Sequence, residues 1–335
     1  MDDIRWGIAG PGRIADKLAK DLALVDGARL AAVGSRSEER ARAFAAEHGD
    51  ADTRGHGSYR ALVDDPDVDV VYIATPHPQH ATLAVACLEA GKAVLVEKAF
   101  TATLGGAWRV VDTARTQGVF AMEAMWTRFQ PAVVRVRELI AQGAIGEVRS
   151  VQADLGTMRD VDPDDRLFSP ELGGGALLDL GVYTVSFAQM VLGTPRRVVA
   201  VGSMETTGVD ADGAMLLSFD EGRFATLQSS FHSPTPGQAR VFGTTGWIDV
   251  LPRFHHPTSI VLHTGDDPHD PGEQIDLPAH GSGLSHELDE VVACLRAGAT
   301  ESTVMPLDDT LAVQGVLAEA AEQLGLAFRE DDTPV

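Results

Sequence analysis

Cysteine is scarce in this sequence: Cys87 and Cys294 are the two among 335 residues, and they form no C-x-x-C pair. This scarcity argues against a zinc site and favours a reducing, cytoplasmic compartment. No uninterrupted apolar run approaches the ~20 residues that cross a bilayer. Basic side chains are few as well, since 27 Lys and Arg stand against 49 Asp and Glu, for a formal net charge of −22. An acidic surface repels phosphate backbones and anionic lipids, so neither nucleic acid nor membrane is an expected partner.

The sequence does contain enough apolar residues for a large core. Hydrophobic residues make up 44% of the chain and charged residues 23%, and at ~150 residues per domain the length indicates two domains. In the first third, short apolar strands alternate with helical stretches, which predicts a parallel sheet with crossover helices. The expected strands are Ile4–Ala9, Arg29–Gly34, Val68–Ala74 and Ala93–Val96, and the expected helices are Ala15–Leu24, Glu38–Glu47, Gln79–Ala90 and Leu104–Thr116.

The remainder of the chain follows a different pattern. After a helix expected over Ala176–Leu192, strand candidates recur between turn signals, which indicates a mainly antiparallel meander. The prediction is therefore an α/β protein with a boundary near Met122. Residues 1–122 form the parallel part, and residues 123–335 form a second α/β domain with a large, open, mainly antiparallel sheet.

A glycine-rich turn follows the first strand, where Gly10, Gly12 and Ala15 give G-x-G-x-x-A. One glycine makes the tight turn, the next lets backbone approach a pyrophosphate, and the small third residue lets helix and strand pack closely. The following helix offers free N–H groups to phosphates, so Arg13 and Ile14 join the two glycines as predicted contacts. Because a strand precedes the turn and a helix and second strand follow, residues 1–122 are predicted to be a Rossmann dinucleotide-binding domain. An ordinary glycine-rich turn is the alternative.

The residues after the second strand indicate which dinucleotide binds. An NAD site usually has Asp or Glu there, on the ribose 2′-hydroxyl, whereas this chain has Ser35 and Arg36, with Arg40 one helical turn further. A hydroxyl and two guanidinium groups suit a 2′-phosphate, so NADP(H) is favoured over NAD(H). Alternatively, the two arginines only solvate the start of a helix.

Three further segments carry polar residues. Thr75, Pro76 and His80 follow the third strand, Glu97 and Lys98 follow the fourth, and the glycine-rich segment Gly173–Gly175 precedes Asp179 and Tyr183. With the G-x-G-x-x-A turn, these segments resemble the Gfo/Idh/MocA oxidoreductase family, whose pattern is T-P-x-x-x-H, then E-K-P, then D-x-G-x-H or D-x-G-x-Y. The segments Met122–Phe129 and Gly174–Tyr183 are similar to the dimeric dihydrodiol dehydrogenase branch, which includes NADP-dependent D-xylose dehydrogenases. One departure is Ala99, where the family has proline.

The resemblance implies roles for particular residues. Lys98, Asp179 and Tyr183 would be catalytic, and Trp126 and Arg128 would bind substrate together with Asp179 and Tyr183. Cofactor contacts would come from Thr75, Pro76, His80, Glu97 and Lys98. It also implies pairing of copies through the C-terminal sheet, as a homodimer or homotetramer.

The chemistry of these side chains supports the implied roles. Asp179 and Tyr183 are four residues apart and project from one helix face. A tyrosine has an ordinary pKa of ~10, and a nearby ammonium such as Lys98 would favour the phenolate. Tyr183 would then take the hydroxyl proton in oxidation and return it in reduction, while Asp179 orients Lys98 or a substrate hydroxyl. The alternative for Tyr183 is a core tyrosine.

Other residues have weaker signals. His77 and His80 offer two metal ligands without a third, so no metal is predicted. His255 and His256 are expected in a loop that borders the substrate.

The predicted function is hydride transfer between NADP(H) and a sugar or diol hydroxyl carbon, as in a D-xylose or aldopyranose 1-dehydrogenase or a trans-dihydrodiol dehydrogenase. Alternatives are a keto-sugar or anhydro-sugar reductase, a non-catalytic NADP-binding sensor, and an enzyme whose net reaction is not a redox change. The partners expected are a small carbohydrate or diol and further copies of the chain.

Overall fold

The computed structural model describes residues 3–335, and the chain divides into two compact units. The first unit consists of Met1–Ala124, His280–Leu311 and Arg329–Val335, and the second of Met125–Ala279 and Ala312–Phe328. This division differs from the sequence analysis, which placed all of residues 123–335 in the second domain. The later segments of the first unit have helical and polar sequences that give no signal of where they pack.

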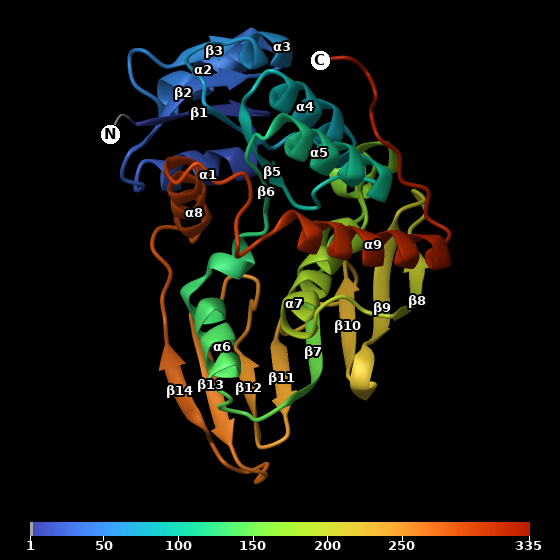
Figure 1. The fold of residues 1–335 in the computed structure, drawn as a ribbon. Helices are drawn as coiled ribbons and strands as arrows, with labels where there is room; N and C mark the ends of the chain where they lie inside the picture. The colour runs from blue at the N-terminus through green and yellow to red at the C-terminus, as the bar shows by residue number, and fades with distance from the viewer. Residues whose placement is uncertain (1–2) are drawn as a thin grey trace. The chain divides into compact units, whose positions relative to one another are not determined.

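A six-stranded parallel sheet forms the centre of the first unit, with strand order β3-β2-β1-β4-β5-β6 (Figure 1). The order reverses between β1 and β4, the point at which open α/β sheets bind ligands beyond their strand ends. The strands are β1 (Ile4–Ala9), β2 (Ala28–Gly34), β3 (Arg54–His56), β4 (Val70–Ile73), β5 (Ala93–Glu97) and β6 (Ala121–Ala124). The helices are α1 (Arg13–Leu22), α2 (Glu38–His48), α3 (Tyr59–Val63), α4 (His77–Glu89), α5 (Leu104–Gln117) and α8 (Ser285–Arg296).

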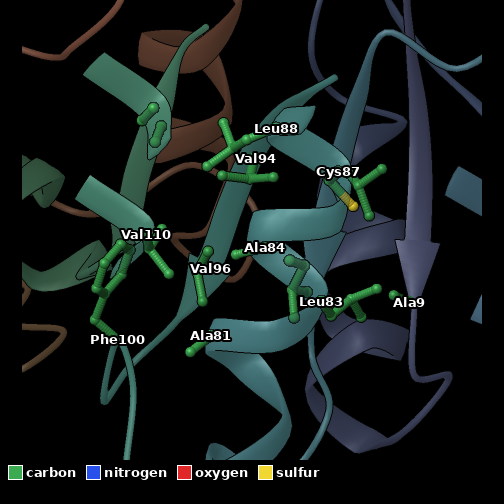
Figure 2. Packing of buried hydrophobic residues seen from close by; sticks show 14 of the residues in the cluster. Ala9, Ala81, Leu83, Ala84, Cys87, Leu88, Val94, Val96, Phe100 and Val110 are labelled. Atoms are coloured by element: carbon green, nitrogen blue, oxygen red, sulfur yellow. The ribbon is translucent and has the colours of Figure 1, made fainter. Parts of the chain in front are cut away.

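The core of this unit lies between the sheet and the helices α4 and α5. Figure 2 shows Ala84 and Leu88 of α4 beside Val94 and Val96 of β5. Alternate residues of these short strands face this core, and the others face the opposite side, so both faces are apolar. That explains why the strands are near-continuous apolar runs in the sequence. Cys87 lies in the same core and is fully buried.

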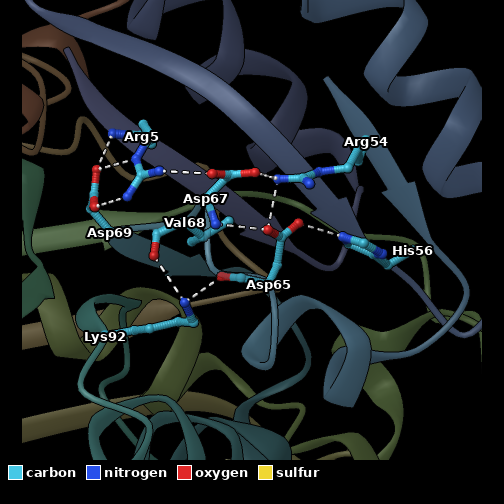
Figure 3. A network of polar contacts seen from close by, with 8 residues as sticks. All are labelled: Arg5, Arg54, His56, Asp65, Asp67, Val68, Asp69 and Lys92. Atoms are coloured by element: carbon cyan, nitrogen blue, oxygen red, sulfur yellow. Dashed lines mark hydrogen bonds and ion pairs between the residues drawn. The ribbon is translucent and has the colours of Figure 1, made fainter. Parts of the chain in front are cut away.

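A polar network joins strands β1 and β3 of the first unit to the segments that precede β4 and β5 (Figure 3). Asp65 accepts from Arg54 Nη2 and from His56 Nε2, at 2.7 Å each. Arg5 donates to Asp69 through Nη2 at 2.7 Å, and Lys92 Nζ donates to the Val68 carbonyl at 2.9 Å. Because its members come from β1, β3 and the segments before β4 and β5, the network fixes how these elements meet.

Two late segments of the chain are anchored in the first unit. Asp21 of α1 is buried and accepts the backbone N–H groups of Leu284 and Ser285, at 2.8 and 3.0 Å, where α8 begins. A carboxylate there compensates the unpaired N–H groups and dipole of the helix start. In the C-terminal tail, residues 329–335, the Thr103 N–H donates to Glu330 Oε1 and the Asp331 N–H donates to the Pro78 carbonyl, both at 2.7 Å.

The second unit contains an eight-stranded sheet with order β14-β13-β12-β11-β7-β10-β9-β8 (Figure 1). Its neighbours are antiparallel except β7 and β10, which run parallel with Ala153 opposite Leu227. The mainly antiparallel sheet is thus as predicted. The strands are β7 (Val148–Gly156), β8 (Arg197–Met204), β9 (Asp210–Ser218), β10 (Phe224–Ser230), β11 (Ala239–Gly243), β12 (Gly246–Val250), β13 (Ser259–Thr264) and β14 (Glu273–Asp276). The helices are α6 (Pro131–Ala141), α7 (Val182–Leu192) and α9 (Leu307–Leu324), whose first residues belong to the first unit.

The two faces of this sheet differ. One face packs against α6 and α7, which contact β12, β13, β7 and β10. The other face, here called the outer face, exposes apolar side chains: Val199, Val201 and Leu216 are 39%, 65% and 48% exposed. A shallow hollow of about 550 Å³ lies over these strands, with Thr226 and Gln228 also in its lining.

One helical stretch in the described residues, Pro170–Leu192, is long and apolar enough to cross a membrane by length and composition. This stretch is longer than any uninterrupted apolar run in the sequence. It includes polar and glycine residues, because it consists of short helices followed directly by α7. In the structure 83% of its most apolar window is buried, as for the core helix of a globular unit.

Candidate functional site

The turn between β1 and α1 has the backbone that the glycine pattern predicts. Gly10 has a φ of +89°, and a Cβ there would lie 2.9 Å from the Ala74 carbonyl oxygen, so a side chain is excluded. Gly12 precedes α1, and a Cβ there would meet only one atom, the Gly10 carbonyl oxygen at 4.0 Å. The turn therefore leaves open space in front of the first N–H groups of α1, as binding of a phosphate requires.

The end of β2 carries the residues expected to select the cofactor. Ser35 is buried, while Arg36 and Arg40 are exposed. Arg40 Nη2 donates to the Pro11 carbonyl at 3.3 Å, so this guanidinium reaches the glycine-rich turn. Ser37 caps α2 by accepting the Arg40 N–H at 3.3 Å.

Thr75 lies beside the same turn, because a Cβ at Gly10 would be 3.1 Å from its nitrogen. Its Oγ1 is buried and has no hydrogen-bond partner within the described residues. Buried hydroxyl groups are nearly always paired. The open turn and this unpaired hydroxyl fit a bound dinucleotide.

Glu97 and Lys98 stand at the end of β5. Glu97 is buried and accepts from the Tyr72 hydroxyl of β4 and from the Lys98 N–H, the latter at 3.2 Å. Lys98 is partly exposed, and the peptide bond between Lys98 and Ala99 is cis. The carboxylate of Glu97 thus contacts the backbone that carries the lysine.

The structure gives His80 surroundings that the sequence did not predict. His80 is fully buried, and its ring nitrogens lie beside backbone carbonyls: Nε2 is 2.7 Å from Thr75 O, and Nδ1 is 3.1 Å from Ala99 O. Direct contact between His80 and cofactor, implied by the resemblance, is difficult for a side chain enclosed in this way. Pro76 is half-buried and directly precedes α4.

In the second unit, Asp179 lies in a π-helical turn, Leu177–Gly181, that leads into α7. The sequence predicted one continuous α-helix over Ala176–Leu192. A π-turn is often found at functional sites, because its wider backbone redirects side chains. The turn begins where Asp210 Oδ2 accepts the Leu177 N–H at 2.6 Å, and burial raises the pKa of Asp210 to about 6.

Asp179 forms an ion pair with Arg166, whose Nη2 is 3.2 Å from Asp179 Oδ1. The aspartate side chain is 12% exposed and the arginine 44%. Sequence analysis missed Arg166 because it lies in an acidic, proline-containing loop that resembles no site pattern.

Tyr183 of α7 belongs to an aromatic cluster. Trp126 Nε1 donates to the Tyr183 hydroxyl oxygen at 3.1 Å. The rings of His255 and Tyr183 are 5.0 Å apart, and those of His256 and Trp126 are 5.4 Å apart. Segments distant in sequence thus bring Trp126, predicted to bind substrate, close to His255 and His256, predicted to border it. All three lie in the cluster that contains the Tyr183 phenol. An N–H that donates to a phenol oxygen stabilises the phenolate.

Arg128 was predicted to bind substrate, but the structure buries its side chain against α7. It is 2% exposed, and its Nε and Nη2 donate to Ser186 Oγ at 3.2 Å and Gln189 Oε1 at 2.5 Å, both on α7. These contacts hold the helix that carries Tyr183.

Within residues 3–335, Asp16, Glu47 and His48 place potential metal-ligand atoms within 4.8 Å of one another. Asp16 already accepts from Lys20 Nζ at 2.8 Å and pairs with His48 at 3.1 Å. Since these groups engage one another, the cluster gives no support to a metal site.

The fold and these side chains define a dinucleotide-dependent oxidoreductase, and comparisons agree. The model described as an oxidoreductase family with an NAD-binding Rossmann fold matches residues 4–125, and that of the Gfo/Idh/MocA C-terminal domain matches residues 133–249. The chain belongs to the Gfo/Idh/MocA family.

Curated relatives match over nearly their full lengths. The trans-1,2-dihydrobenzene-1,2-diol dehydrogenase of Mus musculus is 36% identical, with 98% of this chain and 99% of that protein covered. The Xenopus tropicalis protein of the same name is 34% identical, with 97% and 99% covered.

Solved structures show the same architecture. An aldose-aldose oxidoreductase from Caulobacter crescentus, complexed with glycerol, has a TM-score of 0.84 at 26% identity, covering 96% of this chain and 98% of that one. KijD10, a 3-ketoreductase from Actinomadura kijaniata in complex with NADP and TDP-benzene, has a TM-score of 0.83 at 27% identity, covering 98% and 99%.

Proposed function

We propose that this protein transfers hydride between NADP(H) and a hydroxyl-bearing carbon of a sugar or diol. The observation that carries the proposal is the Tyr183 phenol, which accepts the Trp126 N–H at 3.1 Å beside two histidines. The full-length relatives named as dihydrodiol dehydrogenases and the aldose-aldose oxidoreductase support the substrate class. Asp179 and Arg166 together provide a carboxylate and a guanidinium that can hydrogen-bond to substrate hydroxyls.

The proposed chemistry assigns the proton to Tyr183. A bound nicotinamide supplies the hydride acceptor in oxidation and the donor in reduction. Tyr183 Oη takes the hydroxyl proton in oxidation and returns it in reduction, and the Trp126 N–H stabilises the phenolate between the two. Lys98 stays a predicted catalytic residue from the sequence, and Glu97 holds its backbone nitrogen.

For the cofactor, we propose NADP(H) in preference to NAD(H). The exposed guanidinium groups of Arg36, just after β2, and Arg40, in the first turn of α2, support this, because arginine binds phosphate in a bidentate manner. The NADP in the KijD10 complexes is consistent with it. Gly10, Gly12, Arg13 and Ile14 would hold the pyrophosphate, and Ser35 and Thr75 would contact the riboses.

The test is reduced-nicotinamide absorbance with NADP and NAD in parallel, on aldopentoses, aldohexoses and trans-diols. We expect turnover with NADP on one substrate class. Tyr183→Phe is expected to lose more than about 100-fold in kcat, within the range for a general acid–base residue, with NADPH affinity nearly unchanged. Tyr59→Phe, the same change outside the aromatic cluster, serves as the control at saturating cofactor. Near-normal turnover of Tyr183→Phe would refute the proton-transfer role.

Reduction of a keto-sugar or anhydro-sugar is the second candidate, favoured by the likeness to a 3-ketoreductase. It would show NADPH oxidation with keto-sugars and no reverse reaction with aldoses. Product formation without net NADPH change would indicate an internal redox cycle, and tight NADPH binding without any turnover would indicate a sensor.

We further propose that copies associate through the outer face of the second unit's sheet, as a homodimer or homotetramer in the cytoplasm, without nucleic-acid or membrane partners. Exposed Val199, Val201 and Leu216 support this, because contiguous apolar surface on a sheet usually meets a partner. Light scattering of wild type and Val201→Lys tests it: a monomer mass for the wild type would refute the association.

A further inference from the structure

The glycine-rich segment Gly173–Gly175 lets two other elements come close to the start of the π-helical turn. Gly175 has a φ of +113°, and a Cβ there would overlap Oδ1 of Asp210, the first residue of β9. A Cβ at Gly174 would lie 2.6 Å from the Leu167 carbonyl oxygen, in the loop before this segment. Glycine is needed at both positions, because a side chain would displace β9 or this loop.

The backbone of Gly175 connects the two segments that form the Asp179–Arg166 ion pair. Its N–H donates to the carbonyl of Leu167, the neighbour of Arg166, at 2.9 Å. Its own carbonyl accepts the Asp179 N–H at 3.3 Å. The ion pair itself joins Arg166 Nη2 and Asp179 Oδ1 at 3.2 Å. The position of Gly175 therefore affects where both charged side chains lie.

Asp210 holds the start of the turn from β9. Its side chain is fully buried, and its Oδ2 accepts the Leu177 N–H at 2.6 Å. Burial raises the pKa of this carboxyl to about 6, while hydrogen bonds from the N–H groups of Leu177, Asp210 itself and Ala176 act in the opposite direction. The first N–H groups of a helix have no acceptor within the helix, so a carboxylate placed there stabilises the turn.

We propose that Asp210 is a positioning residue that fixes the Asp179–Arg166 pair for substrate binding. It acts through the backbone of Gly175 and Leu177, which lead into the turn. The functional part of this inference rests on the proposed role of the ion pair in holding substrate hydroxyls. The structural part, a helix start fixed by a buried carboxylate, does not depend on that role.

The proposed proton-transfer group has a separate support. The Tyr183 hydroxyl oxygen accepts the Trp126 N–H at 3.1 Å. Further along α7, Arg128 donates to Ser186 Oγ at 3.2 Å. Neither contact involves Asp210, so loss of the Asp210 carboxylate should act on substrate affinity more than on kcat.

The first experiment measures amide hydrogen exchange residue by residue, by NMR, in the protein without substrate. We expect the Leu177 N–H to exchange slowly in wild type, and to lose about tenfold or more of its protection in Asp210→Ala, which lacks the acceptor. Asp210→Asn should keep the protection, because the side-chain oxygen of asparagine still accepts. Fast exchange of Leu177 in wild type, or equal protection in Asp210→Ala, would overturn the proposal. This result holds even if the proposed function is wrong.

The second experiment measures kinetics with the sugar or diol that is turned over, at saturating NADP. Asp210→Ala should raise KM about tenfold, as for loss of a hydrogen bond to a charged group, with kcat and NADPH affinity nearly unchanged. Asp210→Asn should return KM close to the wild-type value. A fall in kcat and in NADPH affinity without a rise in KM would show that Asp210 has only a general structural role, and so would a lack of rescue by asparagine.

The control is Asp220→Ala, the same change at a carboxylate that is 61% exposed and pairs with Arg196; it should leave KM and Leu177 exchange unchanged. Gly175→Ala tests the same contact from its other partner, because the added Cβ would overlap Asp210 Oδ1, and we expect the same rise in KM. If neither Asp210→Ala nor Gly175→Ala folds, the exchange of Leu177 in wild type still decides whether the helix start is fixed.

Discussion

Replacing Asp65 by asparagine should destabilise the first unit by about 2–3 kcal/mol. The Asp65 side chain is 1% exposed and accepts from Arg54 and His56 at 2.7 Å each. Burial raises the pKa of this carboxyl, but hydrogen bonds from His56 and the Asp67 N–H and the charge of Arg54 outweigh it, so the pKa is lowered. Each charge-assisted hydrogen bond contributes ~1.5–3 kcal/mol. The side-chain oxygen of asparagine still accepts one of these bonds without the charge, so part of one contribution remains.

The loss stays below the ~3–5 kcal/mol typical of a broken buried ion pair. In the variant, Arg54, which is 42% exposed, still forms an ion pair with Asp67 at 2.7 Å. Its charge is therefore neither buried nor unpaired. Hydrogen exchange of β1 and β4 peptides measures the change, because it reports the first unit separately from the second. Since the pKa is lowered in the folded state, the stabilisation is present above the unfolded pKa of ~3.9 and is lost as pH falls through the folded value.

Asp67→Asn is the matched control, because its side chain is 51% exposed, and a change below about 1 kcal/mol is expected. If Asp65→Asn and Asp67→Asn lose the same protection from hydrogen exchange, the burial of Asp65 does not determine how strongly it pairs with Arg54 and His56. If the first unit of Asp65→Asn is still less stable than that of wild type at pH 2, where Asp65 is protonated, the effect is not due to the charge.

Two further predictions concern buried titratable groups. Burial raises the pKa of Asp210 to about 6, so the native state holds the proton more tightly than the unfolded chain, and stability should fall between pH 4 and 6 and level off above. Asp210→Asn should remove that slope in thermal unfolding and gain up to about 3 kcal/mol at pH 7; an unchanged slope would contradict this. Burial also raises the pKa of Cys87 to about 12 and of Cys294 to about 11. A thiol reagent at pH 8 should therefore titrate no thiol in native protein and two in urea, and one reactive native thiol would contradict this.

The parallel sheet could be predicted because its strands are buried on both faces. Strands such as Val70–Ile73 are wholly buried and therefore read as unbroken apolar runs. The short edge strands Arg54–His56 and Glu273–Asp276 were missed, because they contain no fully buried residue and their pairing is decided by neighbours distant in sequence. The parallel pairing of β10 with β7 was missed because strand pairing is decided by neighbours that are distant in sequence.

The candidate site was predictable where chemistry follows local sequence. The glycine-rich turn is of this kind, because a positive φ at Gly10 and open space at Gly12 are properties of those residues themselves. The burial of Arg128 and the pairing of Arg166 with Asp179 were not, since they depend on tertiary contacts between segments without periodicity. The roles assigned to individual site residues stay predictions that the variants above address.

The anchoring of α8 by Asp21 has a consequence for biosynthesis. The carboxylate emerges from the ribosome early, but its helix is encoded after the strands of the second unit. At roughly 5–20 residues per second, on the order of ten to fifty seconds separate the two. During that interval the carboxylate of Asp21 lacks the N–H groups of α8 that donate to it in the folded protein, while the second unit's strands are already available to pair. Completion of the first unit is thus a late event in synthesis, and translation rate over residues 125–279 becomes a determinant of how much chain reaches the folded state.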